Sequence, residues 1–316
     1  MPMDSYAIEL SAPDITPYAA GNTGIPYVTS FESGRAGPHV LVNALTHGNE
    51  ICGAIALDEL FRAGVRPAAG KLTLSLANVG AYRRFDAADP SASRFVDEDF
   101  NRVWDTSVLD GPRRSAELAR ARELRPVIDT ADLLLDIHSM QHATAPLMLA
   151  GLTEKCLDLA RRVGVPEIVV RDAGHAAGRR MRDYGGFGDP KSSKAALLVE
   201  CGQHWEKRSA DVAIDTTWRF LAISGVLPSD QAARIMATKS KSQRVVTVTD
   251  AVTIASDRFE FAADYRGLEV IPRARTVIGR DGERDIRTPY DDCVLIMPSR
   301  RLTRGQTAVR LGRFTG

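Results

Sequence analysis

The sequence predicts an α/β domain followed by a small all-β domain. Three observations lead to this fold class. Short β-like runs alternate with helical patterns from about residue 38 to 225, a polar and helix-breaking segment follows at 228–244, and short β-branched runs separated by turn residues fill the rest. With 316 residues the chain can form two domains of unequal size. We therefore expect one domain at 1–228, a linker at 229–244 and a β domain at 245–316.

The first domain should contain a mainly parallel or mixed sheet covered by helices. Apolar runs bounded by turn residues predict strands at 39–45, 72–78, 132–137, 167–170 and 195–200. Apolar residues at three- and four-residue intervals predict helices at 50–63, 113–129, 152–163 and 208–224. Between residues 171 and 194 the sequence becomes rich in glycine and charge, which we interpret as a lid or binding loop.

The last 72 residues, 245–316, have the pattern of a small sandwich or barrel. The predicted strands are 245–249, 251–254, 268–271, 276–278, 293–297 and 307–311. We interpret this domain as a structural cover or an assembly surface, so a homo-oligomer is one expectation.

Composition excludes several classes of partner. The chain has 41 Lys and Arg against 40 Asp and Glu and shows no basic block with interleaved aromatics, so nothing indicates nucleic-acid binding. Residues 1–6 lack the basic and apolar regions of a signal peptide, and no stretch approaches the roughly 18 apolar residues of a membrane span. We expect a soluble cytoplasmic protein that acts on a small molecule. The four widely spaced cysteines are expected to be free and buried.

Metal-ligand and proton-transfer side chains follow three of the predicted strands. His47 and Glu50 come two and five residues after the run that ends at Leu45, His138 follows Ile137, and Glu200 follows Val199. Side chains just past the carboxyl ends of separate strands can converge in the crevice of an open α/β sheet. Two His and one Glu form a known ligand set for a catalytic zinc that keeps one position open for water. This set would be His47, Glu50 and His138, leaving Glu200 for proton transfer.

The loop after the second predicted strand carries two arginines with an asparagine beside the second. Arg94 and Arg102 lie eight positions apart, and Asn101 precedes Arg102. The planar guanidinium binds carboxylates through two parallel hydrogen bonds and can polarise a carbonyl oxygen. The alternative for a single arginine of this kind is a surface salt bridge with Asp97 or Asp99.

Four ordered motifs resemble those of the succinylglutamate desuccinylase/aspartoacylase family, a branch of the zinc carboxypeptidase-like enzymes. They are His47-Gly48-Asn49-Glu50, the segment from Arg94 to Asn101-Arg102, Asp136-Ile137-His138-Ser139 and Val199-Glu200-Cys201-Gly202. The resemblance covers about residues 38–205, and the small C-terminal β domain of the family would account for 245–316. It implies a three-layer α/β/α zinc-carboxypeptidase-like domain with a mixed sheet.

The resemblance also implies an activity, which is hydrolysis of the amide bond of a small N-acyl amino acid or a close analogue. One zinc ion would be held by His47, Glu50 and His138. Arg94 would act on the scissile carbonyl, Asn101 and Arg102 would bind a substrate carboxylate, and Glu200 would be the base and then the acid. A zinc carboxypeptidase, an ester deacylase and a zinc-binding protein without catalysis are the alternatives.

The departures from the family pattern concern specificity. Family members that act on acylated acidic amino acids look to have a further arginine shortly before the general base, and segment 188–194 of this chain has none. The candidates that could replace its charge are Lys191, Lys194, Arg179, Arg180 and Arg182. Tyr184 and Tyr290 are candidate substrate-facing hydroxyls. His142 and His204 could be alternative ligands, although a supporting or surface role is the preferred interpretation.

Overall fold

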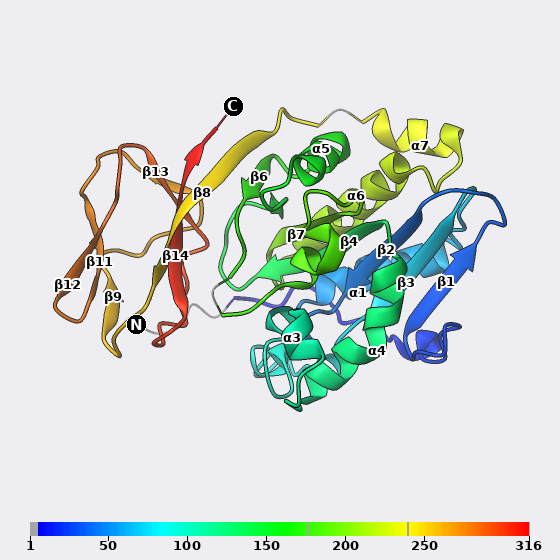
Figure 1. Cartoon of the computed structure of the whole chain (residues 1–316), viewed down its shortest axis with the longest axis horizontal. Helices are drawn as coiled ribbons and strands as arrows, with labels where there is room; N and C mark the ends of the chain where they lie inside the picture. Colours follow the sequence, from blue (N-terminus) through cyan, green and yellow to red (C-terminus); the bar gives the residue numbers. More distant parts are fainter. Residues whose placement is uncertain (1–5, 176, 239, 316) are drawn as a thin grey trace.

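A computed structural model of the protein describes residues 6–175, 177–238 and 240–315. An α/β region and a smaller β region lie side by side (Figure 1). They share one sheet of 11 strands in the order β1-β3-β2-β4-β7-β5-β6-β8-β14-β13-β10. The predicted fold class, an α/β region with a mixed sheet and a C-terminal β region, is confirmed.

The α/β region supplies the first seven strands of this sheet. They are β1 (Val28–Glu32), β2 (His39–Ala44), β3 (Lys71–Leu76), β4 (Leu133–Met140), β5 (Leu147–Leu149), β6 (Ile168–Arg171) and β7 (Ala195–Gln203). Strands β3, β2, β4 and β7 are parallel neighbours, whereas β1 and β5 run antiparallel to β3 and β7. All five predicted strands form, and β1 and β5 are additions.

Helices cover both faces of this part of the sheet. The helices are α1 (Ile51–Arg62), α2 (Val79–Tyr82), α3 (Thr106–Leu109), α4 (Ala116–Thr130), α5 (Glu154–Val163), α6 (Lys207–Ser224) and α7 (Ser229–Met236). Short 3-10 turns are η1 (Thr16–Tyr18), η2 (Ala92–Arg94), η3 (Phe100–Arg102), η4 (Met181–Asp183) and η5 (Gly185–Phe187). The four predicted helices correspond to α1, α4, α5 and α6.

Two hydrophobic cores, one on each face of the sheet, account for the three layers. Because successive residues of a strand point to opposite faces, Val40 and Val42 of β2 belong to the core with α1, α5 and α6, whereas Leu41 belongs to the core with α4. Burying both faces explains why β2 and β7 read as continuous apolar runs rather than as alternating patterns.

The C-terminal region adds four strands to the large sheet and forms a second sheet of three. Its strands are β8 (Arg244–Thr253), β9 (Phe259–Phe261), β10 (Glu269–Ile271), β11 (Val277–Asp281), β12 (Arg284–Arg287), β13 (Cys293–Ile296) and β14 (Thr307–Phe314). The second sheet has the order β12-β11-β9. Ile278 of β11 packs with Leu295 and Val309 from the large sheet, which gives the region a small sandwich core.

The two regions are joined through β8, which pairs in parallel with β6 from Ile168 opposite Arg244 to Arg171 opposite Thr247. The segment expected to be a linker, 229–244, contains α7. Its residue Lys239 lies outside the described residues. So do residues 1–5, which were part of the segment expected to lack a signal peptide. The proposed division into two domains at this segment stays a prediction.

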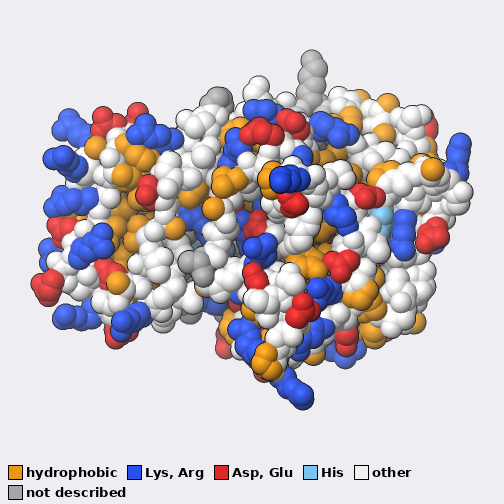
Figure 2. Space-filling model, in the orientation of Figure 1, with side chains coloured by type: hydrophobic (Ala, Val, Ile, Leu, Met, Phe, Trp, Pro, Cys, Tyr) orange, Lys and Arg blue, Asp and Glu red, His pale blue; other side chains and the backbone are white. Residues whose placement is uncertain are grey.

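The surface carries charges of both signs. Basic and acidic side chains lie interspersed over the face of the molecule shown in Figure 2, including the C-terminal β region on the left. None of the helices in the described part of the chain combines the length and the apolar character that crossing a membrane requires.

Candidate metal centre and its pocket

The predicted ligands lie where the parallel strands end. His47 and Glu50 flank the turn between β2 and α1, His138 lies on β4, and Glu200 is its register partner on β7. Gly48 allows this turn to pass close to the chain, because a Cβ there would be 2.4 Å from backbone atoms of Ala81 and Ser93. A larger residue at position 48 would clash with this neighbouring backbone, so the turn that carries His47 and Glu50 requires glycine there.

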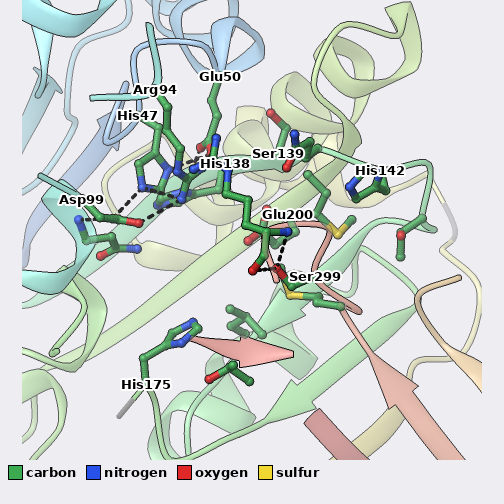
Figure 3. Close-up of a pocket in the computed structure, with 18 of the residues that line it drawn as sticks. His47, Glu50, Arg94, Asp99, His138, Ser139, His142, His175, Glu200 and Ser299 are labelled. Atoms are coloured by element: carbon green, nitrogen blue, oxygen red, sulfur yellow. Dashed lines mark hydrogen bonds and ion pairs between the residues drawn. The ribbon is translucent and has the colours of Figure 1, made fainter. Parts of the chain in front are cut away.

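His47, Glu50 and His138 form a compact cluster (Figure 3). One ligand atom from each lies within 4.8 Å of the others. The Glu50 carboxylate lies between the two imidazoles, with Oε1 2.7 Å from His47 Nδ1 and Oε2 2.8 Å from His138 Nδ1. All three side chains are buried.

An aspartate holds the far nitrogen of each imidazole. His47 Nε2 lies 2.9 Å from Asp99 Oδ1, and His138 Nε2 lies 2.8 Å from Asp136 Oδ2. Metal-binding histidines commonly have their second ring nitrogen anchored by a carboxylate in this way, which fixes the ring and makes it a better ligand. The donor set and its anchors therefore fit a divalent cation such as zinc.

The charges in the cluster are strongly coupled. Burial alone would raise the pKa of Glu50, but the two imidazoles hold it well below its usual range. Burial alone would lower the pKa of His138, but Asp136 and Glu50 raise it well above the ordinary histidine value. Because a metal competes with protons for such donors, cation binding here would displace a proton from His138.

Glu200 faces the same space as the cluster (Figure 3). It is 7% exposed, and its Oε2 atom is buried without a hydrogen-bond partner among the described residues. Burial raises the pKa of Glu200 to about 8, with nearby carboxylates acting in the same direction and nearby cationic groups against it. A carboxyl group with a pKa near neutrality suits proton transfer in both directions.

Arg94 and Asp99 lie beside the cluster. Arg94 Nη2 donates to Asp99 Oδ2 at 3.1 Å, and Nη1 lies 3.4 Å from Glu50 Oε1. Arg94 therefore forms the salt bridge with Asp99 that the sequence left open as an alternative, but both residues line the pocket. Asp99 is a functional candidate that sequence reasoning missed, although the motif around Asn101-Arg102 contains it.

The loop that carries Arg94 and Asp99 is held in place by hydrogen bonds to the rest of the α/β region. Glu117 of α4, which is 0% exposed, accepts backbone N–H bonds from Val96, Asp97 and Glu98 at 2.6, 3.0 and 3.2 Å. At the other end of the loop, Asn101 Oδ1 accepts the Met181 backbone N–H at 2.9 Å. Asn101 and Arg102 thus line the pocket from a loop that is hydrogen-bonded at both ends.

The pocket has a volume of about 230 Å³ and is lined by both regions of the molecule. The α/β region contributes the cluster, Arg94, Asn101, Arg102 and Glu200. The C-terminal region contributes residues 297–301 together with Gln306, Thr307 and Arg310. This placement supports the interpretation of the C-terminal region as a cover of the site.

The structure does not bring the two predicted tyrosines into this pocket. The Tyr184 hydroxyl donates to Asp129 at 2.8 Å and accepts from Arg125 at 2.9 Å, and its ring packs in the core beneath α4. The Tyr290 hydroxyl lies 2.5 Å from Thr249 Oγ1. Neither tyrosine is among the described residues that line the pocket, so this placement does not support the substrate-facing roles expected for them, which stay predictions.

Of the basic residues considered as replacement charges, Arg180 lines the pocket, whereas Arg179, Arg182, Lys191 and Lys194 do not. The Lys194 ammonium bonds the Asp129 carbonyl, and the Arg182 guanidinium donates to the carbonyls of Ala150 and Ala196 at 3.1 and 2.9 Å.

The remaining histidines near the site do not join the ligand cluster. His204 is buried with Nδ1 2.8 Å from Ser139 Oγ, and burial lowers its pKa to about 3. His142 lines the pocket at some remove from the cluster (Figure 3). The four cysteines are free and buried as predicted.

The mixed sheet, the helices on both faces and the His47–Glu50–His138 cluster at the strand ends define an α/β protein with a candidate metal site. The family model of the succinylglutamate desuccinylase/aspartoacylase catalytic domain matches residues 36–217, which is more than half of the chain. The protein belongs to this family of deacylases. No match was found among curated protein sequences.

Solved structures show the same fold at low sequence identity. Succinylglutamate desuccinylase from Vibrio parahaemolyticus is 17% identical with a TM-score of 0.67, over 92% of this chain and 87% of that one. The enzyme of the same name from Vibrio cholerae is 18% identical with a TM-score of 0.66, over 92% and 86%. The product-bound ectoine utilization protein EutE from Ruegeria pomeroyi is 18% identical with a TM-score of 0.60, over 90% and 88%.

Proposed function

We propose that this protein is a zinc-dependent deacylase that hydrolyses the amide bond of a small N-acyl amino acid or a close analogue, releasing a carboxylate and a free amine. The observation that carries the proposal is the meeting of three buried metal-ligand side chains, Glu200 and Arg94 in one pocket. A bound zinc would supply a Lewis acid and lower the pKa of water. His47, Glu50 and His138 would hold it.

Glu200 is assigned the proton transfers. Its carboxyl group accepts a proton from the attacking water and later delivers it to the nitrogen of the departing amine. Burial raises the pKa of Glu200 to about 8, so both protonation states are accessible close to neutral pH.

Arg94 and the Asn101-Arg102 pair are assigned to the substrate. Arg94 can turn a guanidinium N–H toward the carbonyl oxygen, where negative charge develops during attack. Asn101 Oδ1 is already used by Met181 N, which leaves the amide N–H groups for a substrate carboxylate. Arg102 lines the pocket, and its Nη1 is held by the Asn101 carbonyl at 2.7 Å and stands 4.0 Å from Asp99, which leaves its other donors for a substrate carboxylate.

The test is metal analysis followed by a hydrolysis panel. Purified protein should contain about one zinc per chain, the stoichiometry of a site with three protein ligands. It should cleave some members of a series of acetyl-, formyl- and succinyl-amino acids. Esters and peptides with a free carboxyl terminus are included, because faster cleavage of either would favour an ester deacylase or a carboxypeptidase.

A matched variant separates metal binding from catalysis. Glu200→Gln keeps the shape of the side chain and should retain the zinc while losing about 100- to 10,000-fold in kcat. A fully active variant would remove Glu200 from the reaction, and zinc without any hydrolysis would favour a binding protein. A cytoplasmic location and a homo-oligomer remain predictions for cell fractionation and light scattering.

A further inference from the structure

Ser139 and His204 form a hydrogen-bonded pair in the wall of the pocket. Ser139 follows the candidate ligand His138 on β4, and His204 directly follows β7. Ser139 Oγ lies 2.8 Å from His204 Nδ1, and both side chains are buried while they line the pocket. The reaction proposed above uses neither residue, so the pair is a polar feature of the pocket without an assigned role.

The segment that carries the His204 ring is held in a fixed position. The His204 backbone N–H donates to the Met140 carbonyl at 2.8 Å. The next residue, Trp205, donates from its backbone N–H to Gln203 Oε1 at 2.9 Å and from its indole N–H to the Asn49 carbonyl at 3.3 Å. Asn49 lies in the turn after β2 that carries two of the metal ligands. A polar group that is already held in place loses little entropy when it binds a ligand.

One nitrogen of the His204 ring remains for a ligand. Nδ1 is used by Ser139, and Nε2 has no hydrogen-bond partner among the described residues. Burial lowers the pKa of His204 to about 3, and the Glu50 charge opposes this shift. A histidine of such low basicity is poorly suited to take a proton from a serine, so this pair does not indicate a serine nucleophile. The pair is better suited to binding than to proton transfer.

A neutral Ser–His pair can present either a donor or an acceptor to a ligand. When Ser139 donates to Nδ1, the ring proton is on Nε2, which then donates into the pocket. When Nδ1 carries the proton and donates to Ser139, Nε2 is an acceptor. A hydroxyl group both donates and accepts, so it matches either arrangement, whereas a methyl group matches neither and leaves a polar atom unpaired.

The pair lies at the end of the pocket opposite to the assigned carboxylate site. Arg102 and His175 line both this pocket and a groove formed by the Gly-rich loop. His142 lines both this pocket and a different cavity, which shares no described lining residue with that groove. Figure 3 accordingly shows Ser139 and His142 on one side of Glu200 and His175 on the other.

The proposed reaction determines which half of the substrate meets this pair. The amine half has its carboxylate on Asn101 and Arg102, and its nitrogen takes a proton from Glu200. The acyl half leaves the scissile carbonyl in the other direction, which leads toward Ser139 and His204.

We propose that Ser139 and His204 bind a hydroxyl group on the acyl half of the substrate, so that short hydroxyacyl groups are the preferred acyl class. This inference rests on the proposed function and specifies its acyl group. His204 Nε2 makes the contact and determines specificity, and Ser139 is a positioning residue that holds the ring. Glycolyl and 3-hydroxypropionyl groups belong to this class, whereas simple alkanoyl groups do not.

The kinetic test compares acyl groups of equal size. N-glycolyl and N-propionyl derivatives form one pair, and N-3-hydroxypropionyl and N-butyryl derivatives form the other, all on the amino acid that the hydrolysis panel cleaves fastest. In at least one pair the hydroxyl member should have a kcat/KM about 10-fold higher, the usual effect of one hydrogen bond to a neutral group. His204→Phe keeps an aromatic ring beside Trp205 but has no nitrogen, so it should lose most of this preference. The alkyl member should change by less than about threefold.

His142→Phe is the matched control, because His142 is a histidine that lines the same end of the pocket. This variant should keep the wild-type preference. Ser139→Ala removes the positioning partner and should reduce the preference several-fold while zinc content stays unchanged. His204→Gln, whose amide both donates and accepts, should retain part of the preference, which a purely structural role of the ring would not explain. It also replaces His204→Phe in the comparison if circular dichroism shows that the phenylalanine variant is unfolded.

Two kinetic results would overturn the inference. One is a wild-type protein that cleaves both members of each pair equally well or prefers the alkyl member. The other is a hydroxyl preference that persists in folded His204→Phe, because the hydroxyl would then be bound by another group, such as the metal.

A binding measurement separates this inference from the proposed function. In calorimetry on zinc-loaded Glu200→Gln protein, the hydroxyl member of the preferred pair should bind about 10-fold more tightly, and adding His204→Phe should remove the difference. If the wild-type protein cleaves no member of the panel, the same titration is made on it with the alanine derivatives. A difference that depends on His204 then supports the hydroxyl site although the proposed activity fails. Cleavage without any hydroxyl preference in rate or binding supports the proposed function and refutes this inference.

Discussion

Replacing Asp136 by asparagine should weaken metal binding without removing any of the three ligands. Asp136 is 0% exposed and accepts three hydrogen bonds. Its Oδ2 faces His138 Nε2 at 2.8 Å, and its Oδ1 accepts from Asn43 Nδ2 and Thr46 Oγ1, both at 2.8 Å. An asparagine has one acceptor oxygen, so its N–H groups must face a donor on one side or the other.

The size of the loss in zinc affinity follows from this mismatch between the asparagine N–H groups and the neighbouring donors. Losing the charged bond to His138 should cost about 1.5–3 kcal/mol, which corresponds to roughly 10- to 100-fold in zinc affinity. Burial would raise the pKa of Asp136, but His138 and its other donors lower it, so the carboxylate is charged at neutral pH and the substitution removes a full charge. Competition with a chromophoric chelator at pH 7 measures the affinity directly.

Asp132→Asn is the control for this experiment. Asp132 immediately precedes β4, and its Oδ2 accepts the His39 backbone N–H at 2.8 Å, far along the strand from the cluster. It should leave zinc affinity unchanged. A wild-type affinity in Asp136→Asn would refute the view that this carboxylate orients His138.

Three further outcomes test the rest of the site. Arg102→Ala should raise KM for carboxylate-bearing substrates by about 10- to 100-fold, and equal effects on uncharged amides would contradict a carboxylate clamp. Asp172 is buried, and Arg180 holds its pKa below the unfolded value near 3.9, so its contribution is complete at neutral pH and lost as pH falls below about 4. Asp172→Asn should cost about 3–5 kcal/mol at pH 7 and less at pH 3 in urea unfolding; a loss that does not depend on pH would exclude this carboxylate as the titrating group. Gly178→Ala should displace Arg102 and raise KM, because its Cβ would lie 2.2 Å from the Arg102 carbonyl, whereas Gly185→Ala meets nothing within 4 Å and should not; similar kinetics for both variants would show that the loop is free to shift.

The ligand cluster could be predicted because its residues follow strands that are apolar throughout. The apolar run of β2 stops shortly before His47, and that of β4 stops at Ile137, just before His138, although β4 itself continues to Met140. Parallel pairing brings these positions to one edge of the sheet. Motif spacing then identified Arg94 and Arg102 as loop residues of the same edge. These inferences needed only local pattern and one topological rule.

Other parts depended on pairings between distant segments. Arg310 reaches the pocket because β14 pairs with β8, which pairs with β6, and no local pattern in β14 reveals that chain of contacts. Strand β5 has only three residues, too few for a period to be recognised. The positions of the Tyr184 and Tyr290 hydroxyls could not be predicted for a related reason, since the direction of a hydroxyl depends on the core that surrounds its ring.

The C-terminal region continues the sheet of the α/β region, so removing it would break backbone hydrogen bonds of that sheet. Among the described residues, the large sheet of 11 strands has two edge strands, β1 and β10. A protein cut before Arg244 would expose the main-chain donors and acceptors of β6 that now pair with β8. Exposed edge strands can pair with other chains. We therefore expect truncated versions of this protein to aggregate.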